Sequence, residues 1–386
     1  MRSHSMDRLD DVAVAAPTAP TRRARWLRVA LSLLCAIGAM SVLGVAPASA
    51  AVLKVRSGQS IQQAVDAANP GDTIEVEPGT YDGYVTIAKD GITLRGAGSG
   101  VGGSRLVPAG PPANCDSGIC VMGQLGDGLQ VIRPVRGVHV TGFAVNGFPG
   151  SGVLALGDTG SAFDHIVAAG NGNFGITSVF SSADRYLSNV AFSNDFAGFQ
   201  IADSPQADAQ LRGNVAYDNR FGIFVIGASR GSITGNELYD NCSGLGFFDA
   251  GDNGRTSTWM ASDNVIEHNN RSCPALPEGD PMISGNGILV LGAQHIVLQH
   301  NEVRLNQPAD GTPTGTPTSL AGGIVVMTIP SAARTAPTDD LVVDNVVCDN
   351  LPANLVYDGT GTGVRFVNNQ CVANRDVAAN VAGRGD

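Results

Sequence analysis

The sequence predicts an all-β fold, a single-stranded right-handed parallel β-helix with three strands per turn, roughly ten or more turns and a short N-terminal capping helix. The first observation is an internal repeat: residues 209–225 and 231–247 are near copies of one another. Each copy is an apolar strand, a Gly-Asn turn, a second short strand that closes on Asn, and Gly followed by a third strand. The second is that the unit recurs along most of the chain, at spacings of roughly 22 to 44 residues. The 50 glycines suit a chain that turns this often.

Residues 1–50 have the pattern of an export signal. A basic stretch with Arg22, Arg23 and Arg28 precedes an apolar run over 29–45, and Ala48-Ser-Ala50 resembles a cleavage site. We therefore expect cleavage after Ala50, a secreted or extracellular protein, and no stable membrane insertion once the signal is removed. The alternative is an uncleaved membrane anchor, because the apolar run approaches the ~20 residues that span a bilayer.

The charge balance bears on the partner. The formal net charge is −11, and removal of residues 1–50 makes it more negative because that segment holds more Arg than Asp. A strongly acidic secreted protein is a poor nucleic-acid binder, so nucleic acid is excluded as a partner. A polysaccharide or cell-wall glycan is expected instead, and an acidic polysaccharide would need a cation or a focused basic patch.

Six cysteines follow the signal segment, an even number that predicts disulfides in an oxidising compartment. Six cysteines allow 15 pairings. Only near neighbours meet in a solenoid, which favours sequential pairing. The expected bridges are Cys115–Cys120, Cys242–Cys273 and Cys348–Cys371.

Along the chain, residues 51–137 are expected to form the N-terminal cap and first turns, 138–375 the repeats, and 376–386 a flexible tail. Ser60 and Gln63 form a capping-box pattern ahead of a short amphipathic helix. Short alternating strands follow it. The Gly/Pro-rich stretch over 97–130 is expected to be a loop region pinned by the first disulfide.

The repeats align on two asparagine positions, which predict two hydrogen-bonded amide ladders. The closing position holds Asn146, Asn171, Asn194, Asn219, Asn241, Asn269, Asn306, Asn350 and Asn374. Five residues earlier stand Asn189, Asn214, Asn236, Asn264, Asn301, Asn345 and Asn369, with Thr141 and Ile166 in the first two units.

The same alignment gives three inward apolar columns, one per strand. The column of the first strand runs from Tyr186 to Phe366 and that of the second strand from Ala191 to Cys371, with one residue per turn. The column of the third strand runs from Ile176 to Ile324. Trp259 falls in the core pattern and is expected to be buried; the alternative is a sugar-binding platform. The third strand also places apolar residues outward (Phe224, Ile226, Phe248, Leu289, Leu291, Val325, Met327). A covering segment such as 97–130 is the expected explanation, with a partner or a subunit interface as alternatives.

The N-terminal motifs resemble a known superfamily. Ser60-Ile-Gln-Gln-Ala-Val, Pro78-Gly-Thr-Tyr81 and Asp90-Gly-Ile-Thr-Leu-Arg-Gly96 are similar to the first turns of the pectate-lyase-like superfamily, and the later units resemble its mannuronan epimerase-like repeats. The resemblance implies the β-helix fold and activity on polysaccharides. The Asp-Pro-His-Asp of alginate epimerases, the polygalacturonase motifs and the Arg-x-Pro-x-x-Arg of pectate lyases are missing. No family catalytic residue is therefore transferred.

Stacked turns predict a lateral polar patch, because equivalent residues lie about 4.8 Å apart. The expected catalytic residues are His268, His300, Arg304, Asp263 and Glu267, and the expected substrate-binding residues are Asp240, Glu302 and Asp344. Insertions over 249–258, 270–285 and 307–321 are expected to wall a groove there. The alternative is a set of solvated charge ladders.

The expected chemistry is lyase or C5-epimerase proton abstraction next to a uronate carboxyl, with a His or Arg as the base. A non-catalytic glycan-binding solenoid and a glycoside hydrolase are the alternatives. No cofactor is required. Calcium is a possible ligand, because Asp249 and Asp252 lie in an oxygen-rich loop, although a plain turn explains the same residues.

Overall fold

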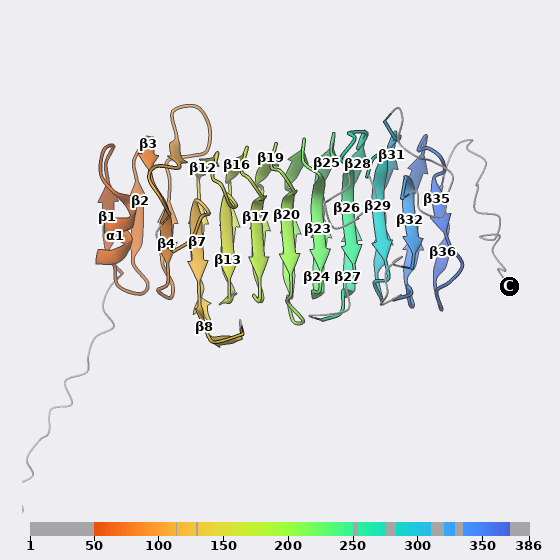
Figure 1. Cartoon of the computed structure of the whole chain (residues 1–386), viewed down its shortest axis with the longest axis horizontal. Helices are drawn as coiled ribbons and strands as arrows, with labels where there is room; N and C mark the ends of the chain where they lie inside the picture. The colour runs from red at the N-terminus through yellow and green to blue at the C-terminus, as the bar shows by residue number, and fades with distance from the viewer. Residues whose placement is uncertain are drawn as a thin grey trace, which may run out of the picture. The chain divides into compact units, whose positions relative to one another are not determined.

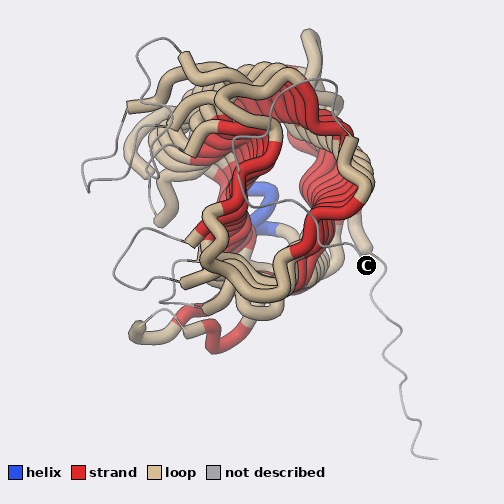
Figure 2. Tube along the Cα trace, turned by 90° about the vertical axis from the view of Figure 1, so that its right-hand side faces the viewer, coloured by secondary structure: helices blue, strands red, loops and turns tan. Residues whose placement is uncertain are grey.

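The computed structural model describes residues 50–112, 114–128, 130–249, 254–274, 283–309, 320–328 and 335–370. Three parallel sheets, here called A, B and C, run side by side along these residues. The chain visits them in the order A, B, C in each turn, so the strands form three walls around a packed interior (Figure 2). Successive turns follow one another along the axis from β1 to β36 (Figure 1). The predicted right-handed parallel β-helix is confirmed.

Sheet A has twelve strands, which pair in sequence order. Its strands are β1 (Val52–Val55), β2 (Thr73–Val76), β5 (Thr93–Arg95), β11 (His139–Thr141), β15 (Ala162–Asp164), β18 (Arg185–Leu187), β21 (Ala209–Arg212), β24 (Ser229–Thr234), β27 (Ser257–Ser262), β30 (Val297–Gln299), β33 (Leu341–Val343) and β36 (Arg365–Val367).

Sheet B has ten strands. They are β3 (Gly79–Asp82), β6 (Ser104–Val107), β12 (Phe143–Asn146), β16 (Val167–Ala169), β19 (Val190–Phe192), β22 (Val215–Tyr217), β25 (Glu237–Tyr239), β28 (Val265–Glu267), β31 (Glu302–Arg304) and β34 (Val346–Cys348).

Sheet C also has ten strands, and most of them are longer. They are β4 (Val85–Ile87), β7 (Ile119–Met122), β13 (Val153–Leu156), β17 (Phe174–Val179), β20 (Ala197–Ala202), β23 (Phe221–Ile226), β26 (Ser243–Phe248), β29 (Asn286–Leu291), β32 (Gly322–Met327) and β35 (Leu355–Tyr357). Two small pairs complete the strands: β10 (Val135–Arg136) with β14 (Asp158–Thr159), and the antiparallel hairpin of β8 (Gln124–Leu125) and β9 (Val131–Arg133).

Helix α1 (Ile61–Ala67) lies at the N-terminal end of the coil (Figure 1). The hydroxyl of Ser60 accepts a hydrogen bond from the Gln63 N–H, as the capping pattern predicts. Ile61 and Val65 are buried. The helix therefore covers the apolar interior that the first turn would otherwise expose.

Both asparagine ladders are present. From Asn189 onward at the corner between sheets A and B, and from Asn171 onward at the corner between B and C, the buried Asn donates its side-chain N–H to the Asn carbonyl one turn further on. That carbonyl also accepts the backbone N–H of the preceding Asn. The amides thus satisfy backbone groups that the sharp corners would leave without partners.

The first repeat is displaced by two residues from the predicted alignment. Asn146 pairs with Ala169 in the strand ladder, so Phe148, not Asn146, occupies the closing position opposite Asn171. The Phe148 N–H donates to the Asn171 carbonyl, and its ring is buried. Phe143 likewise stands where Thr141 was expected. In this first repeat, packed phenylalanines therefore replace the ladder amides. At the C-terminal end, the Asn350 side-chain N–H donates to the Asn354 carbonyl, and Asn374 lies outside the described residues.

The inward columns and two disulfides agree with prediction. Tyr186 and Leu211, Ala191 and Ala216, and Ile176 and Phe199 are register partners and are buried. Trp259 is also core: it is 1% exposed, and its indole N–H donates to the Ala228 carbonyl.

The disulfides Cys115–Cys120 and Cys242–Cys273 are formed. Cys371 lies outside the described residues, so the Cys348–Cys371 bridge stays a prediction, as do the tail over 376–386 and the signal segment.

The outward apolar residues of sheet C are not covered by residues 97–130. Phe224, Leu289, Val325 and Met327 are buried in a second apolar cluster outside the sheet. The partners are residues that follow the corner between sheets B and C, namely Cys273, Ile283 and Leu320. The described ends of the insertions over 270–285 and 307–321 therefore pack on sheet C, because its outer face is the apolar one.

Candidate functional site

The residues predicted as a lateral patch lie across the outer face of sheet B and along its two edges. Arg304 joins two of them: its Nε is 2.6 Å from Glu267 Oε2, and its Nη1 is 3.1 Å from Glu302 Oε1. His268 Nδ1 approaches Glu267 Oε2 at 4.0 Å, and His300 Nε2 approaches Asp344 Oδ2 at 4.0 Å. Asp240 and Asp263 are exposed at the edges. The structure thus brings together an Arg–Glu cluster with one His, and separately a His–Asp pair.

Backbone conformation accounts for the residue types at five of these positions. The five have positive φ angles of 52° to 57° and immediately precede a ladder Asn at a corner (Asp240, Asp263, His268, His300, Asp344). Asp, Asn and His adopt this left-handed conformation more readily than other non-glycine residues. Glycine occupies the equivalent corners at Gly213 and Gly235. The corner geometry therefore explains these side chains without any chemistry.

A second cluster, which the sequence did not single out, lies on the outer face of sheet A. Asp164 in β15 is contacted by His139 Nε2 from β11 and by His165 Nδ1 at 2.7 Å. The Thr141 hydroxyl donates to Asp164 Oδ1 at 2.5 Å. This cluster, here called the His139 cluster, consists of His139, Thr141, Asp164 and His165.

The His139 cluster is arranged for proton transfer. Burial alone would raise the pKa of Asp164, but hydrogen bonds from His165, Thr141 and His139 outweigh it and hold this pKa below its usual value. When the ionised carboxylate accepts one N–H from each imidazole, the second nitrogen of each ring is not engaged by Asp164. The side chain of His139 is 39% exposed and that of His165 is 69% exposed.

Backbone preference does not explain His139. The described histidines at 165, 268, 295 and 300 all have positive φ angles, whereas His139 lies in a strand. Asp164 is also in a strand. The left-handed backbone of the corners therefore does not select the residue type at His139 or Asp164. A function at the protein surface explains these two side chains better than backbone conformation does.

Arginines extend the same face. Arg185 is two register positions from His139, with the small Ala162 between them, and Arg212 is two positions from Asp164. Among the described residues, neither arginine has a carboxylate within ion-pair distance. At ~4.8 Å per turn, His139 and Arg185 are about 10 Å apart along the axis, and Ala162 with its small side chain lies between them in the column.

The two-residue displacement of the first repeat explains why this cluster escaped detection. With the register of the structure, Thr141 stands directly beside Asp164, and His139 stands beside Ala162. The predicted alignment placed Thr141 at a ladder corner instead. The buried Phe143 and Phe148 are the signal of the true register, in which Thr141 stands beside Asp164.

Other carboxylates point into the coil at the corner between sheets C and A. Asp72, Asp184 and Asp340 each accept a backbone N–H of the preceding turn, from Ala51, Ser161 and Ile296. Burial raises the pKa of Asp184 well above its usual value, and the neighbouring Asp158 raises it further; burial also raises the pKa of Asp158. Burial raises the pKa of Asp340 to about 7. These groups have the same backbone-binding role as the ladder asparagines.

The structure adds little to the calcium hypothesis. Asp249 is buried and its Oδ2 is 2.9 Å from Arg255 Nη1, while Asp252 lies outside the described residues. In the described part of the chain, no three His, Cys, Asp or Glu side chains converge as a metal site would require. Within the same residues no helix has the length and apolarity to cross a membrane.

Comparison with solved structures gives β-helix proteins at low sequence identity. The A-module of mannuronan C-5 epimerase AlgE6 from Azotobacter vinelandii is similar over 82% of this chain and 91% of its own, with a TM-score of 0.55 and 19% identity. The A-module of mannuronan C-5 epimerase AlgE4 from the same organism is similar over 84% of this chain and 95% of its own, with a TM-score of 0.56 and 17% identity. The DFA-IIIase of Arthrobacter chlorophenolicus A6 is similar over 82% of this chain and 90% of its own, with a TM-score of 0.53 and 13% identity.

These likenesses show the fold. The sequence search of curated proteins finds no match. A family model described as the right-handed beta helix region matches residues 114–256 and 151–328, which together span more than half of the sequence. The chain therefore belongs to the right-handed beta helix family.

Proposed function

We propose that this protein acts on an acidic polysaccharide by proton abstraction, and that the His139 cluster is the reacting site. The observation that carries the proposal is the contact of one ionised carboxylate, Asp164, with two imidazoles. Such a carboxylate fixes the tautomer of each ring and strengthens it as a base. The epimerases among the similar structures support the substrate class, since they are named for a uronate polymer, mannuronan.

In the proposed reaction, the free nitrogen of His139 takes the proton from the carbon next to a uronate carboxylate. Arg185 and Arg212 bind that carboxylate and stabilise the negative charge that develops on it. The electron pair left by the proton then expels the glycosidic oxygen at the adjacent carbon. This oxygen receives a proton from the imidazolium of His165, so the products are a free sugar end and an unsaturated uronate.

The arrangement favours a lyase over an epimerase. His139 lies in β11 and His165 at the corner directly after β15, and both contact the same carboxylate, so proton acceptor and proton donor would reach the sugar from one side. Epimerisation needs a donor on the opposite face of the sugar ring. A syn elimination, in which the proton and the glycosidic oxygen leave from the same face of the ring, needs no such second face.

The residues predicted from the sequence form the second candidate site for the same reaction. There His268 or His300 would be the base, Arg304 and the carboxylates of Asp263 and Glu267 would hold the uronate group, and Asp240, Glu302 and Asp344 would bind neighbouring sugars. The carboxylates outnumber the single arginine, so this site would need a cation such as calcium to accept an acidic polymer.

Matched variants separate the two sites. The purified protein is incubated with alginate, polygalacturonate and polyglucuronate, with and without Ca²⁺, and the ultraviolet absorbance of the unsaturated product is followed together with the epimer ratio by NMR. We expect product from the natural sequence and from His300→Gln, and a loss of about 10²- to 10⁴-fold in His139→Gln. Equal thermal midpoints would show that both variants are folded.

The reverse pattern would move the reaction to the sheet B residues. A changed epimer ratio without unsaturated product would replace the lyase by an epimerase. Polymer binding without either product would replace the enzyme by a non-catalytic glycan-binding solenoid.

A further inference from the structure

A hollow at the corner between sheets C and A is lined by apolar side chains and a few polar ones, as sugar-binding sites are. Its volume is about 510 Å³, within the range of small-ligand pockets. Three successive turns, together with Val131 of β9 and Pro134, supply its walls. The lining residues that matter are the apolar Val131, Pro134, Phe180 and Pro205 and the polar Asp203 and Gln206.

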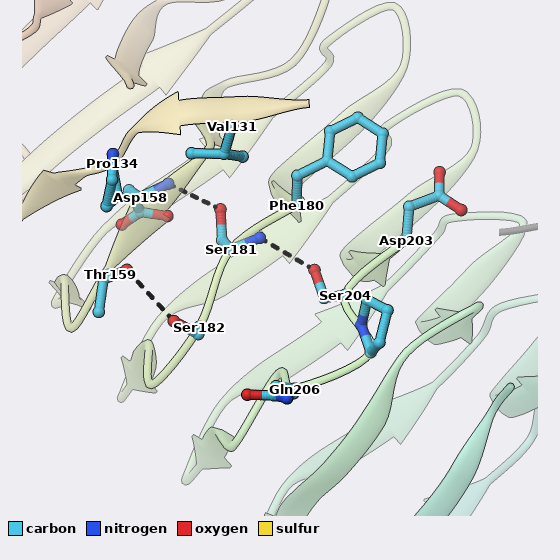
Figure 3. Close-up of a pocket in the computed structure, with 11 residues that line it drawn as sticks. Val131, Pro134, Asp158, Thr159, Phe180, Ser181, Ser182, Asp203, Ser204 and Gln206 are labelled. Carbon is cyan, nitrogen blue, oxygen red and sulfur yellow. Dashed lines mark hydrogen bonds between the residues drawn. The ribbon is translucent and has the colours of Figure 1, made fainter. Parts of the chain in front are cut away.

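The hollow arises from one column of corner residues. Gly157, Phe180, Asp203 and Gly227 occupy equivalent positions at the ends of β13, β17, β20 and β23, and all four have positive φ angles. The glycines on either side carry no side chains. Phe180 and Asp203 therefore extend side by side from the strand ends, as Figure 3 shows.

Phe180 is the anomaly in this column. Its φ is 52°, a conformation that bulky residues rarely adopt, whereas the other members are Gly or Asp. Its side chain is only partly buried, so the core does not account for it. Strained backbone positions of this kind cluster at ligand sites. Ligand binding therefore explains a partly exposed phenylalanine at this position better than packing within the protein does.

The floor beneath the ring is held rigidly. The Ser181 hydroxyl accepts the Asp158 N–H at 3.2 Å, and the Ser204 hydroxyl accepts the Ser181 N–H at 3.0 Å (Figure 3). The hydroxyls of Thr159 and Ser182 bond to each other at 3.2 Å. Successive turns are thus fixed in register, and the ring and the polar groups keep a constant separation.

We infer that this hollow binds a neutral pyranose unit of a glycan. A pyranose has an apolar C–H face that packs on an aromatic ring, and vicinal hydroxyls that suit a planar carboxylate or amide such as Asp203 and Gln206. The lining contains carboxylates and no basic residue, which disfavours a uronate. The site goes beyond the proposed function, because the His139 cluster and its arginines take the acidic part of a polymer.

The two sites adjoin. Thr159 and Ser182 lead within three residues into β15 and β18, the strands that carry Ala162, Asp164 and Arg185. A polymer that contains both neutral and acidic sugars could therefore contact the hollow and the face of sheet A at the same time.

The test is isothermal titration calorimetry of the purified protein with cellobiose, lactose, mannobiose and a galacturonate trimer. Phe180→Gly removes the ring and relieves the backbone, so it should weaken the binding of a neutral disaccharide about tenfold or more without lowering the thermal midpoint. Ala183→Gly is the matched control: it lies in the same turn with a φ of 61°, outside the hollow, and should bind as the natural sequence does.

Arg185→Gln should weaken the galacturonate trimer and leave the neutral sugar unchanged, which keeps a failure of this site distinct from a failure of the proposed function. The inference is overturned if none of the three neutral disaccharides binds. It is also overturned if Phe180→Gly binds them as tightly as the natural sequence, or if a lower thermal midpoint shows that the ring is structural.

Discussion

The outer faces of sheets A and B both carry histidines, carboxylates and arginines, yet the two surfaces differ in what the backbone requires. On sheet B, the histidines and most of the aspartates stand at corners with positive φ angles, next to the ladder asparagines. On sheet A, His139 and Asp164 stand within strands, where no left-handed backbone selects the residue type, and only His165 of the cluster stands at such a corner. The sheet B carboxylates spread along charge ladders, whereas the groups on sheet A converge on one carboxylate.

The difference shows how to weigh titratable residues in a solenoid. A corner that repeats in every turn selects Gly, Asn, Asp and His for conformational reasons, and stacking then aligns these residues into columns that resemble active sites. A strand position imposes no such selection. Polar side chains that meet within strands are therefore the stronger evidence of chemistry.

The largest expected effect tests this comparison through two carboxylates. Asp164→Asn should lower kcat by about 10²-fold or more. The amide cannot accept both imidazole N–H groups as a carboxylate does, so His139 is no longer held in the tautomer that can accept a proton from the substrate. Glu267→Gln, on the sheet B face, should leave kcat unchanged. The measurement is the pH dependence of kcat on a uronate polymer, with the thermal midpoint as the check on folding.

Asp164 acts through the imidazoles, so its replacement should move the pH profile and leave KM nearly the same. A simple fall in thermal midpoint without a change in the profile would give Asp164 a structural role only. An equal loss of kcat in Glu267→Gln would remove the distinction between the two faces.

The next effect concerns two adjacent corner residues, Asn241 and Asp240. Asn241→Ala should lower the free energy of unfolding by about 4 kcal/mol, since it leaves several buried backbone and amide groups without hydrogen bonds. Asp240→Gly should change it by less than about 0.5 kcal/mol, because glycine adopts the same left-handed backbone without strain. Urea unfolding of both variants measures the difference.

A small loss in Asn241→Ala would mean that the ladder is not a main source of stability. A large loss in Asp240→Gly would mean that the carboxylate has a role that the backbone does not explain.

The repeat made the fold predictable, whereas the site depended on the part of the repeat that is least regular. The ladder asparagines at 189–369 and the core columns could be aligned directly, because each corner and each strand imposes the same residue types on every turn. The first repeat could not, because Phe143 and Phe148 fill the ladder positions, and the resulting shift of two residues hid the contact between Thr141 and Asp164. The packing of the insertions on sheet C also escaped prediction, since sequence spacing does not say over which wall a loop folds.

A pH-dependent effect separates corner carboxylates inside the coil from those on its surface. Asp340 has a folded-state pKa of about 7 against 3.8 for an ordinary Asp, because burial disfavours its charged form. The folded state therefore binds more protons than the unfolded state between about pH 4 and pH 7, and this contribution to stability declines as the pH rises through that window. Asp340→Asn keeps the acceptor for the Ile296 N–H and removes the charge.

We expect Asp340→Asn to match the natural sequence near pH 4 and to be more stable by about 4 kcal/mol at pH 8, at ~1.4 kcal/mol for each unit by which the pKa is raised. Asp339→Asn, at the exposed neighbouring position, should change stability by less than about 0.5 kcal/mol at either pH. Urea unfolding across this pH range measures both, and equal stabilities at pH 8 would show that Asp340 is not held in an unfavourable charged state.

The smallest effect is expected at the ion pairs of the sheet B face. Arg304 contacts Glu267 and Glu302, but its side chain is 44% exposed, so solvent screens both pairs. Arg304→Met should therefore lower the free energy of unfolding by less than about 1 kcal/mol, and the loss should shrink at about 1 M salt. Arg212→Met, which breaks no ion pair, is the matched control and should show no salt-dependent change. If Arg304→Met also leaves turnover intact while His139→Gln abolishes it, the sheet B ladder is a solvated charge network; a loss of turnover at Arg304 with little change in stability would instead make that face the reacting one.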